Sequence, residues 1–212
     1  MKYDLSQSIS QRSSGEKDAE NQRIQEIAHE LARRCRLHEK ESEDCQNHVS
    51  PLFIEERIAE DYAKDMGIWI PMSEIISFGV PGPSGNENDI YVSEDTVFKV
   101  NNLLNSQSII SLLERIVFHN IIFPETFYYF IGFTGYEGRS IMPVLRQDLV
   151  KDAYPATSVE IDTYMSAIGF NKLSEGKYHN ELFLVWDILP RNVLKDNEGD
   201  IYVVDAEIKH KP

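Results

Sequence analysis

The chain has 212 residues, of which 42% are hydrophobic and 26% charged, so its composition is that of a soluble globular protein. Its 35 acidic and 21 basic residues give a formal net charge of −14, which argues against direct nucleic-acid binding because such a surface needs a positive stripe. A local basic pocket is still compatible with this balance. No signal peptide, lipidation motif or long apolar run is evident, which predicts a cytoplasmic location and no membrane partner.

The first third of the chain is predicted to be a polar tail followed by two helices. Residues 1–15 are rich in Ser and Gln and are expected to be disordered, whereas apolar residues recur at helical steps over 16–37 and 52–65. Gly67 is a C-terminal stop for the second helix. The apolar stripe of this extension, residues 16–66, either packs on the body of the protein or holds a partner, for which a homodimer is one alternative.

Two cysteines in this region are each followed three residues later by a histidine, as Cys35 with His38 and Cys45 with His48. These side chains are suitable zinc ligands, but their spacing is unusual and no turn separates the two pairs. Two reduced thiols on or beside a helix are the simpler interpretation, and they fit a reducing compartment.

Short apolar runs typical of strands follow Gly67. Residues 68–70 and 75–78 are two such runs, and a glycine-rich segment, residues 79–88, comes after them. Residues 90–92 and 96–100 then form a hairpin. Lys99 interrupts its second strand and faces away from the two apolar neighbours, so after a glycine-rich turn it is a candidate phosphate ligand.

A helix is predicted over residues 103–120 and contains Glu114. Strands over 127–133 and 139–145 come next, and a final helix covers 158–170. The core candidates of the first of these helices are Leu104, Ile109, Leu112, Leu113, Ile116 and Val117.

Residues 183–207 are the most informative stretch of the chain. Two apolar runs separated by a turn over residues 196–199 indicate short buried strands, and Asp187 and Asp205 follow them. Burying an unpaired carboxylate beside an apolar strand is costly, so two of them suggest that a cation is held there. A divalent metal with a phosphate is the natural candidate.

The order of these features resembles the protein-kinase-like fold: a glycine-rich turn, a strand lysine, a helix glutamate, D-x-x-x-x-N and a later strand-end Asp. The most specific part is Asp187-Ile188-Leu189-Pro190-Arg191-Asn192, which is similar to the kinase catalytic loop. The chain looks most like the compact kinase domains of the polyvalent proteins of phages and conjugative elements, which pair G-x-E-N-x-[IV]-Y with V-x-K-V-N. Residues 85–91 and 97–101 carry these two motifs.

This resemblance implies an α+β fold with an antiparallel N-lobe sheet and one inserted helix over residues 67–147. A strongly reduced C-lobe, residues 148–212, would carry the catalytic loop and the metal-binding Asp. The chain stops five residues after Glu207, which implies that the activation segment is missing and weighs against a protein substrate. A partner that completes the C-lobe is left open.

The resemblance also implies a nucleotide site. The backbone at Gly79, Gly82 and Gly85 would cover the phosphates of ATP, because glycine permits close approach and leaves N–H groups free to point at oxygen. The adenine edge would meet backbone groups around Val144 and Leu145.

Catalytic and metal-binding roles follow from the same resemblance. Lys99 would contact the α- and β-phosphates, and Glu114 would hold this lysine by an ion pair. Asp187 would accept the proton of the attacking hydroxyl, while Asn192 and Asp205 would hold Mg²⁺.

Two departures from the kinase pattern are visible. Val185-Trp186 stands where many kinases have His-Arg, and Ala206-Glu207 follows the metal Asp where they have Phe-Gly. Glu207 either offers the cation a second carboxylate or points to water.

The function predicted from these residues is a compact ATP- and Mg-dependent phosphotransferase with an unknown acceptor. The alternative is a nucleotide-binding pseudokinase that acts as a scaffold or regulator and holds a protein partner with its N-terminal helices. A plain interaction module that binds no nucleotide is a third interpretation.

Overall fold

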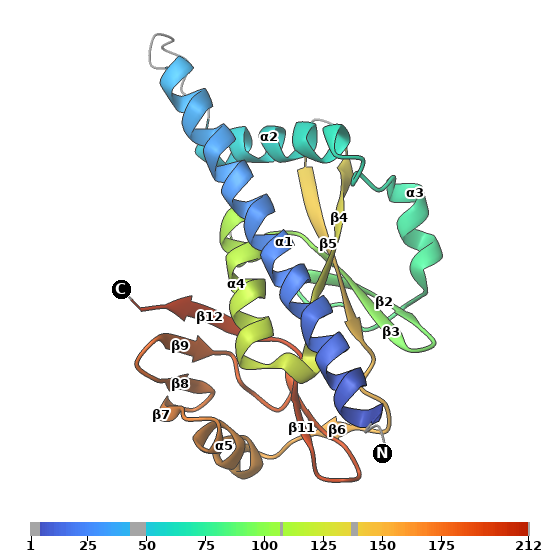
Figure 1. Ribbon diagram of the computed structural model, residues 1–212, viewed down its shortest axis with the longest axis vertical. Helices are drawn as coiled ribbons and strands as arrows, with labels where there is room; N and C mark the ends of the chain where they lie inside the picture. Colours follow the sequence, from blue (N-terminus) through green and yellow to red (C-terminus); the bar gives the residue numbers. More distant parts are fainter. Residues whose placement is uncertain (1–4, 43–49, 107, 137–139, 212) are drawn as a thin grey trace. The chain divides into compact units, whose positions relative to one another are not determined.

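The structure, a computed structural model, describes residues 5–42, 50–106, 108–136 and 140–211 (Figure 1). Its contacts divide the chain into two units: unit 1 is Met1–Val117 with Tyr129–Arg146, and unit 2 is Phe118–Tyr128 with Gln147–Pro212. Both units combine helices with antiparallel sheets, as the predicted α+β class requires. Within the described part of the chain, every helix is too short or too polar to cross a lipid bilayer.

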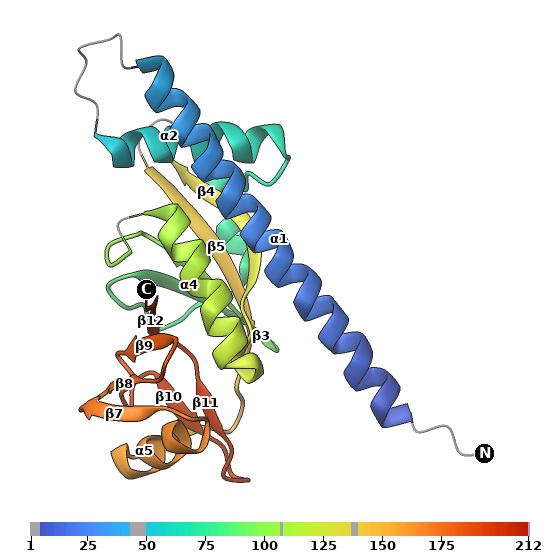
Figure 2. The ribbon, with the colours of Figure 1, turned by 60° about the vertical axis from the view of Figure 1, so that its left-hand side comes forward.

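Unit 1 begins with two helices that pack on each other, α1 (Leu5–Ser42) and α2 (Pro51–Asp65) (Figures 1 and 2). The predicted disorder is wrong for residues 5–15, which are helical, because Ser and Gln tolerate a helix and no proline interrupts it. Gly67 follows α2 with a φ of 68°, as expected of a helix stop. The apolar stripe of α1 is buried through Ile24, Ile27, Ala28 and Leu31.

The main sheet of unit 1 has the strand order β1-β2-β3-β5-β4. In the hairpin of β2 and β3, Ser93 lies opposite Thr96, which confirms the predicted hairpin. The strands are β1 (Val80–Pro81), β2 (Asn88–Ser93), β3 (Thr96–Asn101), β4 (Tyr129–Tyr136) and β5 (Ser140–Asp148).

Helix α1 covers part of the edge strand β4. The ladder of β4 and β5 shifts register between Phe130 and Gly132. Glu20 Oε1 accepts a hydrogen bond of 2.8 Å from the Phe130 N–H, and the Arg23 guanidinium donates to the Phe130 carbonyl. Since unpaired backbone groups on an edge strand invite association with other chains, α1 protects this edge as well as packing on the unit.

Two segments that the sequence predicts as strands have other structures. Residues 68–70 contribute a single parallel bridge, between Trp69 and Phe133, and residues 75–78 are helical. Apolar runs of three or four residues carry too little periodicity to separate a strand from a buried helical turn. The helical elements are α3 (Met72–Ile75) and the 3-10 turn η1 (Ile76–Phe78).

Helix α4 (Ile109–Ile122) begins later than the sequence predicts. The side-chain oxygens of Asn101 and Asn102 accept hydrogen bonds from backbone N–H groups two residues on, which builds a turn instead of a helical start. Leu104 is 60% exposed, so its assignment to the core is wrong. The other candidates are buried: Ile109, Leu112, Leu113, Ile116 and Val117.

Unit 2 contains sheets of order β11-β10-β6 and β12-β9-β8-β7, with α5 (Ser158–Ala167) packed against β7 (Figure 2). The predicted strands are confirmed as β9 (Phe183–Trp186) and β11 (Ile201–Val203). The other strands escape the sequence pattern because none of them contains an apolar run of three or more residues. These are β6 (Tyr154–Pro155), β7 (Asn171–Ser174), β8 (Lys177–His179), β10 (Val193–Lys195) and β12 (Glu207–His210), with the 3-10 turn η2 (Pro124–Thr126).

Helix α5 is fixed at its first turn. Thr157 and Glu160 form a reciprocal capping box, and Lys195 Nζ on β10 lies 2.5 Å from Glu160 Oε1. This ammonium group, together with the bonds to Thr157, lowers the pKa of Glu160 to about 2. Because the folded-state pKa is lowered, the stability gained from ionised Glu160 is present above its ordinary pKa of 4.5 and is lost as the pH falls toward 2.

We therefore expect Glu160→Gln to lower the urea midpoint at pH 7 and the difference from the wild type to shrink as the pH is lowered below 4.5. Glu198→Gln is the matched control, because it removes an exposed carboxylate on the turn between β10 and β11. A difference that stays constant with pH would contradict the ion pair as its source.

The backbone of Gly132 lies close to the backbone of Ile68, which leads to a second prediction. A Cβ atom there would overlap the carbonyl oxygen of Ile68, so Gly132→Ala should cost roughly 2 kcal/mol or more of unfolding free energy. At Gly15, in α1, nothing lies within 4 Å of an added Cβ, and Gly15→Ala should be neutral or slightly stabilising. Chemical denaturation of both variants tests this contrast.

Candidate functional site

The connection between β9 and β10 in unit 2 carries the most constrained polar side chains of the predicted site. Asp187 directly follows β9 with a φ of 63°, a conformation that Asp tolerates better than most residues. The Asn192 amide donates to the Asp187 carbonyl at 2.9 Å and to the Asp187 carboxylate at 2.7 Å. The Arg191 guanidinium pairs with the other carboxylate oxygen. The loop is therefore closed on itself, with the Asp187 side chain held but still 34% exposed.

The strand pairing of unit 2 places the end of β11 beside this loop. Val193 lies opposite Val203, and the Val204 N–H donates to the Asn192 carbonyl at 2.9 Å. Asp205 is the next residue and is half-buried. Glu207, at the start of β12, lies opposite Trp186, the residue before Asp187. The pairing thus places four predicted residues at strand ends, with Asp187 and Glu207 at β9 and β12 of one sheet and Asn192 and Asp205 at β10 and β11 of the other.

Buried side chains fix the backbone that leads into Asp205. Thr126 Oγ1 donates to the Val203 carbonyl at 2.6 Å, and the Tyr128 hydroxyl donates to the Val204 carbonyl at 2.9 Å. Thr126 is in turn bonded to His119 Nε2. Residue spacing does not predict these supports, because they come from an apolar segment nearly eighty residues upstream.

Two of the predicted metal ligands, Asn192 and Asp205, carry oxygen atoms that could coordinate a metal ion. Since the Asn192 amide nitrogen donates to Asp187, its Oδ1 points elsewhere, and this oxygen has no hydrogen-bond partner among the described residues. An amide oxygen and a carboxylate suit Mg²⁺, which takes few protein ligands and fills its shell with water and phosphate oxygens. The residues that the structure describes contain no group of three or more His, Cys, Asp or Glu side chains suited to a metal.

The glycine-rich segment of unit 1 serves different purposes along its length. A Cβ atom at Gly79 would overlap the backbone of Val92, and one at Gly82 would lie 3.0 Å from the Ile90 side chain. These two glycines therefore permit strand packing. At Gly85 nothing lies within 4 Å of an added Cβ, but the Gly85 N–H donates to the Asn88 carbonyl at 3.1 Å and the Gly82 N–H to the Ile90 carbonyl at 2.9 Å, so these two N–H groups are already used. Lys99 lies opposite Ile90 on the paired strand and is 7% exposed.

A buried ion pair fixes the end of this segment to α4. Arg115 Nη2 lies 3.1 Å from Glu87 Oε1, and both side chains are nearly inaccessible, at 9% and 7%. Asn105 and Ser106 also donate to the Glu87 carboxylate, each at 3.1 Å. In the sequence, Glu87 is part of the motif over residues 85–91 and has no predicted role of its own. The sequence feature that could have indicated this role is an acidic residue in the glycine-rich segment together with an arginine in a mostly apolar helix.

The remaining predicted residues lie on ordered elements. Glu114 is exposed on α4, and its role as the partner of Lys99 stays a prediction. Val144 and Leu145 are buried in β5, at 0% and 2% exposure. Cys35 is half-buried in α1. Burial raises the pKa of this thiol, whereas Cys45 and His48 lie outside the described residues.

Comparison with known families bears on this set of residues. Residues 54–212 match the family described as the serine/threonine/tyrosine kinase found in polyvalent proteins. The chain belongs to this kinase family. The match confirms the resemblance predicted from the motifs, and it starts inside α2 and so leaves out α1. A comparison with curated proteins gave no match.

Breaking the Glu87–Arg115 pair in this kinase should be costly. Glu87→Gln leaves a buried guanidinium without its carboxylate, and we expect a loss of about 3 kcal/mol in unfolding free energy. Glu114→Gln removes an exposed carboxylate one residue from Arg115 and should change stability by less than about 0.5 kcal/mol. Equal losses in the two variants, measured by urea unfolding, would contradict a specific role for the buried pair.

Proposed function

We propose that this protein is a compact phosphotransferase that uses ATP and Mg²⁺, with Asp187 as the catalytic base. The observation that carries the proposal is the closed loop in which Asn192 and Arg191 orient the Asp187 carboxylate while leaving it partly accessible. Membership of a kinase family supports the reaction type. The acceptor is a hydroxyl of a small molecule or of another polypeptide.

Each proposed residue has a task that fits its surroundings. Asp187 accepts the proton of the acceptor hydroxyl, because its carboxylate is held by two neighbours and stays accessible. Lys99 binds phosphate oxygens, and the glycine-rich segment lies over them at Gly85, where no side chain intervenes, although the Gly85 N–H itself donates to the Asn88 carbonyl. Glu114 keeps its proposed role beside Lys99. Backbone groups at Val144 and Leu145 remain the proposed contacts of the adenine edge, although both residues lie within β5, opposite Gly132 and Phe130 of β4.

The metal would be held by Asn192 Oδ1 and the Asp205 carboxylate, with Glu207 as an additional carboxylate. Bound Mg²⁺ would neutralise phosphate charge, which is most of what phosphoryl transfer requires. The protein supplies orientation: the bonds from Thr126 and Tyr128 fix the residues that precede Asp205.

A nucleotide-binding pseudokinase is the second candidate, and one observation favours it. Both carboxylate oxygens of Asp187 are already engaged, one by Asn192 and one by Arg191, so an acceptor hydroxyl must share or displace a partner. In this case the protein binds ATP without turnover and serves as a regulatory or scaffold module.

Nucleotide binding and turnover separate the two candidates. We expect ATP with MgCl2 to raise the Tm more than ATP with EDTA, and Asp205→Asn to remove the metal-dependent part of the shift. We expect Asp187→Asn to lower phosphate release or autophosphorylation by roughly 10²- to 10⁴-fold while the Tm shift is retained. Asp152→Asn is the matched control, because Asp152 also has a positive φ, of 50°, and is exposed on a loop.

Several outcomes would overturn the assignment. A Tm shift in the wild type without any turnover supports the pseudokinase. Turnover that is unchanged in Asp187→Asn contradicts the catalytic role of this residue. If neither ATP condition shifts the Tm, the protein binds no nucleotide and the plain interaction module is the better interpretation.

A further inference from the structure

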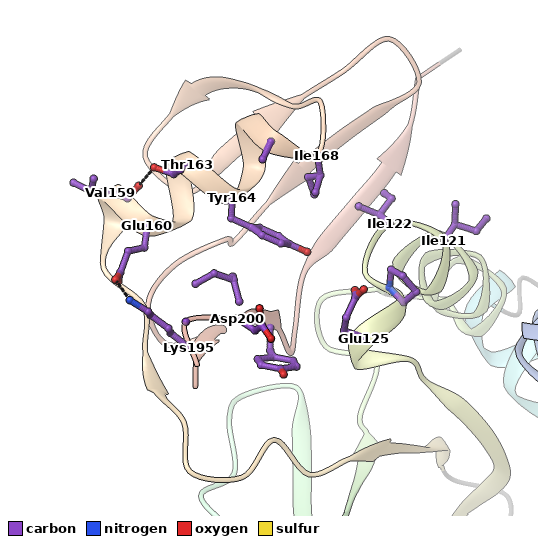
Figure 3. A pocket seen from close by; sticks show the side chains of 15 residues that line it. Ile121, Ile122, Glu125, Val159, Glu160, Thr163, Tyr164, Ile168, Lys195 and Asp200 are labelled. Carbon is purple, nitrogen blue, oxygen red and sulfur yellow. Dashed lines mark hydrogen bonds and ion pairs between the residues drawn. The ribbon is translucent and has the colours of Figure 1, made fainter. Parts of the chain in front are cut away.

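A groove of about 770 Å³ opens on the surface of unit 2 (Figure 3). Its walls come from the last turn of α4 with η2, from α5 and from the hairpin of β10 and β11. Asp187, Asn192 and Asp205 are not among its lining residues. The proposed transfer reaction therefore leaves this groove without a role.

Aliphatic side chains dominate the walls and remain accessible. Ile121 at the end of α4 is 56% exposed, Val159 on α5 is 74% exposed and Ile168 is 37% exposed. Large apolar side chains gathered in one concave surface of this size are typical of ligand or partner sites, which span roughly 300–1,000 Å³.

The rim of the groove is acidic. Lys195 supplies an ammonium group at the rim, but it is paired with Glu160 at 2.5 Å (Figure 3). The carboxylates of Glu125 and Asp200 have no ion-pair partner among the described residues. An occupant should therefore carry positive charge next to its apolar groups.

Tyr164 adds a hydrogen-bond donor inside the groove. Its hydroxyl points toward the side that carries Glu125 and Ile122 (Figure 3) and has no hydrogen-bond partner in the part of the chain that the structure describes. Burial, and then the nearby Glu125 carboxylate, raise the pKa of Tyr164 to about 12, so the hydroxyl keeps its proton at neutral pH. It can donate to a carbonyl group of a bound chain.

The groove is held in shape by the core beneath it. Three groove residues, Ile122, Tyr164 and Ile201, pack against the buried cluster that contains Phe123, Ile161 and Met165. The capping box of Thr157 and Glu160 fixes the start of α5. A site that is formed before binding loses less conformational entropy when it is occupied.

We propose that this groove binds a polypeptide segment that places aliphatic side chains beside a lysine or arginine. The acidic rim excludes nucleic acid, nucleotides and anionic membrane surfaces, all of which need unpaired cations. The aliphatic walls exclude a simple metal or polyamine site. This binding needs neither ATP nor Asp187, so it goes beyond the proposed transferase function.

The probe is a fluorescein-labelled peptide of alternating Leu and Lys, with Leu/Glu and Ser/Lys peptides as comparisons. In fluorescence anisotropy we expect the Leu/Lys peptide to bind roughly tenfold or more tightly than either comparison. Val159→Ser combined with Ile121→Ser should weaken its binding roughly tenfold, because both apolar contacts are lost. Glu125→Gln combined with Asp200→Asn should weaken it roughly two- to fivefold and reduce its salt dependence.

Matched controls separate the groove from general attraction to an acidic protein. Leu173→Ser removes an apolar side chain that is 54% exposed on β7 outside the groove, and Glu94→Gln combined with Glu181→Gln removes the same charge elsewhere. Neither should change the affinity, and Asp187→Asn should bind the peptide like the wild type. The proposal is overturned if the Leu/Lys peptide binds no more tightly than the comparison peptides. It is also overturned if groove and control variants, each with the Tm of the wild type, lose the same affinity for this peptide.

Discussion

The hydrogen bonds from the Asn192 amide to Asp187 are the interaction on which the candidate site depends. They close the loop between β9 and β10 and hold Asp187 in a left-handed conformation at the end of its strand. The Asn192 carbonyl at the same time accepts from Val204, which brings the end of β11 alongside. One residue thus orients the proposed base through its side chain and sets the place from which Asp205 extends through its backbone carbonyl.

In unit 1, a buried ion pair plays a comparable part by joining distant parts of the chain. The buried pair of Glu87 and Arg115 joins the end of the glycine-rich segment to α4, where unpaired charges would be costly. Helix α1 contributes through Glu20 and Arg23, which bond the backbone of Phe130 on the edge strand. The N-terminal extension is therefore integral to this unit, although the family match begins only at residue 54.

Sequence patterns predicted the elements that are long or strongly marked and failed for the others. Helix α2, the hairpin of β2 and β3, and the burial of the apolar face of α4 (Ile109, Leu112, Leu113, Ile116 and Val117) follow directly from spacing. The apolar runs at 68–70 and 75–78 were wrongly predicted as strands, because three or four residues are too few to show whether apolar residues repeat with the period of a strand or of a helix. The prediction of a helix at residues 103–106 was wrong because the side chains of Asn101 and Asn102 compete with a helical start.

By itself, the sequence determined the family and the order of the candidate residues, because D-x-x-x-x-N and the strand lysine are local patterns in which spacing carries the meaning. Only the tertiary structure decided which side chains support them. The bonds from Thr126 and Tyr128 to the end of β11, the burial of Glu87 with Arg115, and the acidic groove beside α5 join residues far apart in the chain. Such contacts arise from packing, and no spacing along the sequence encodes them.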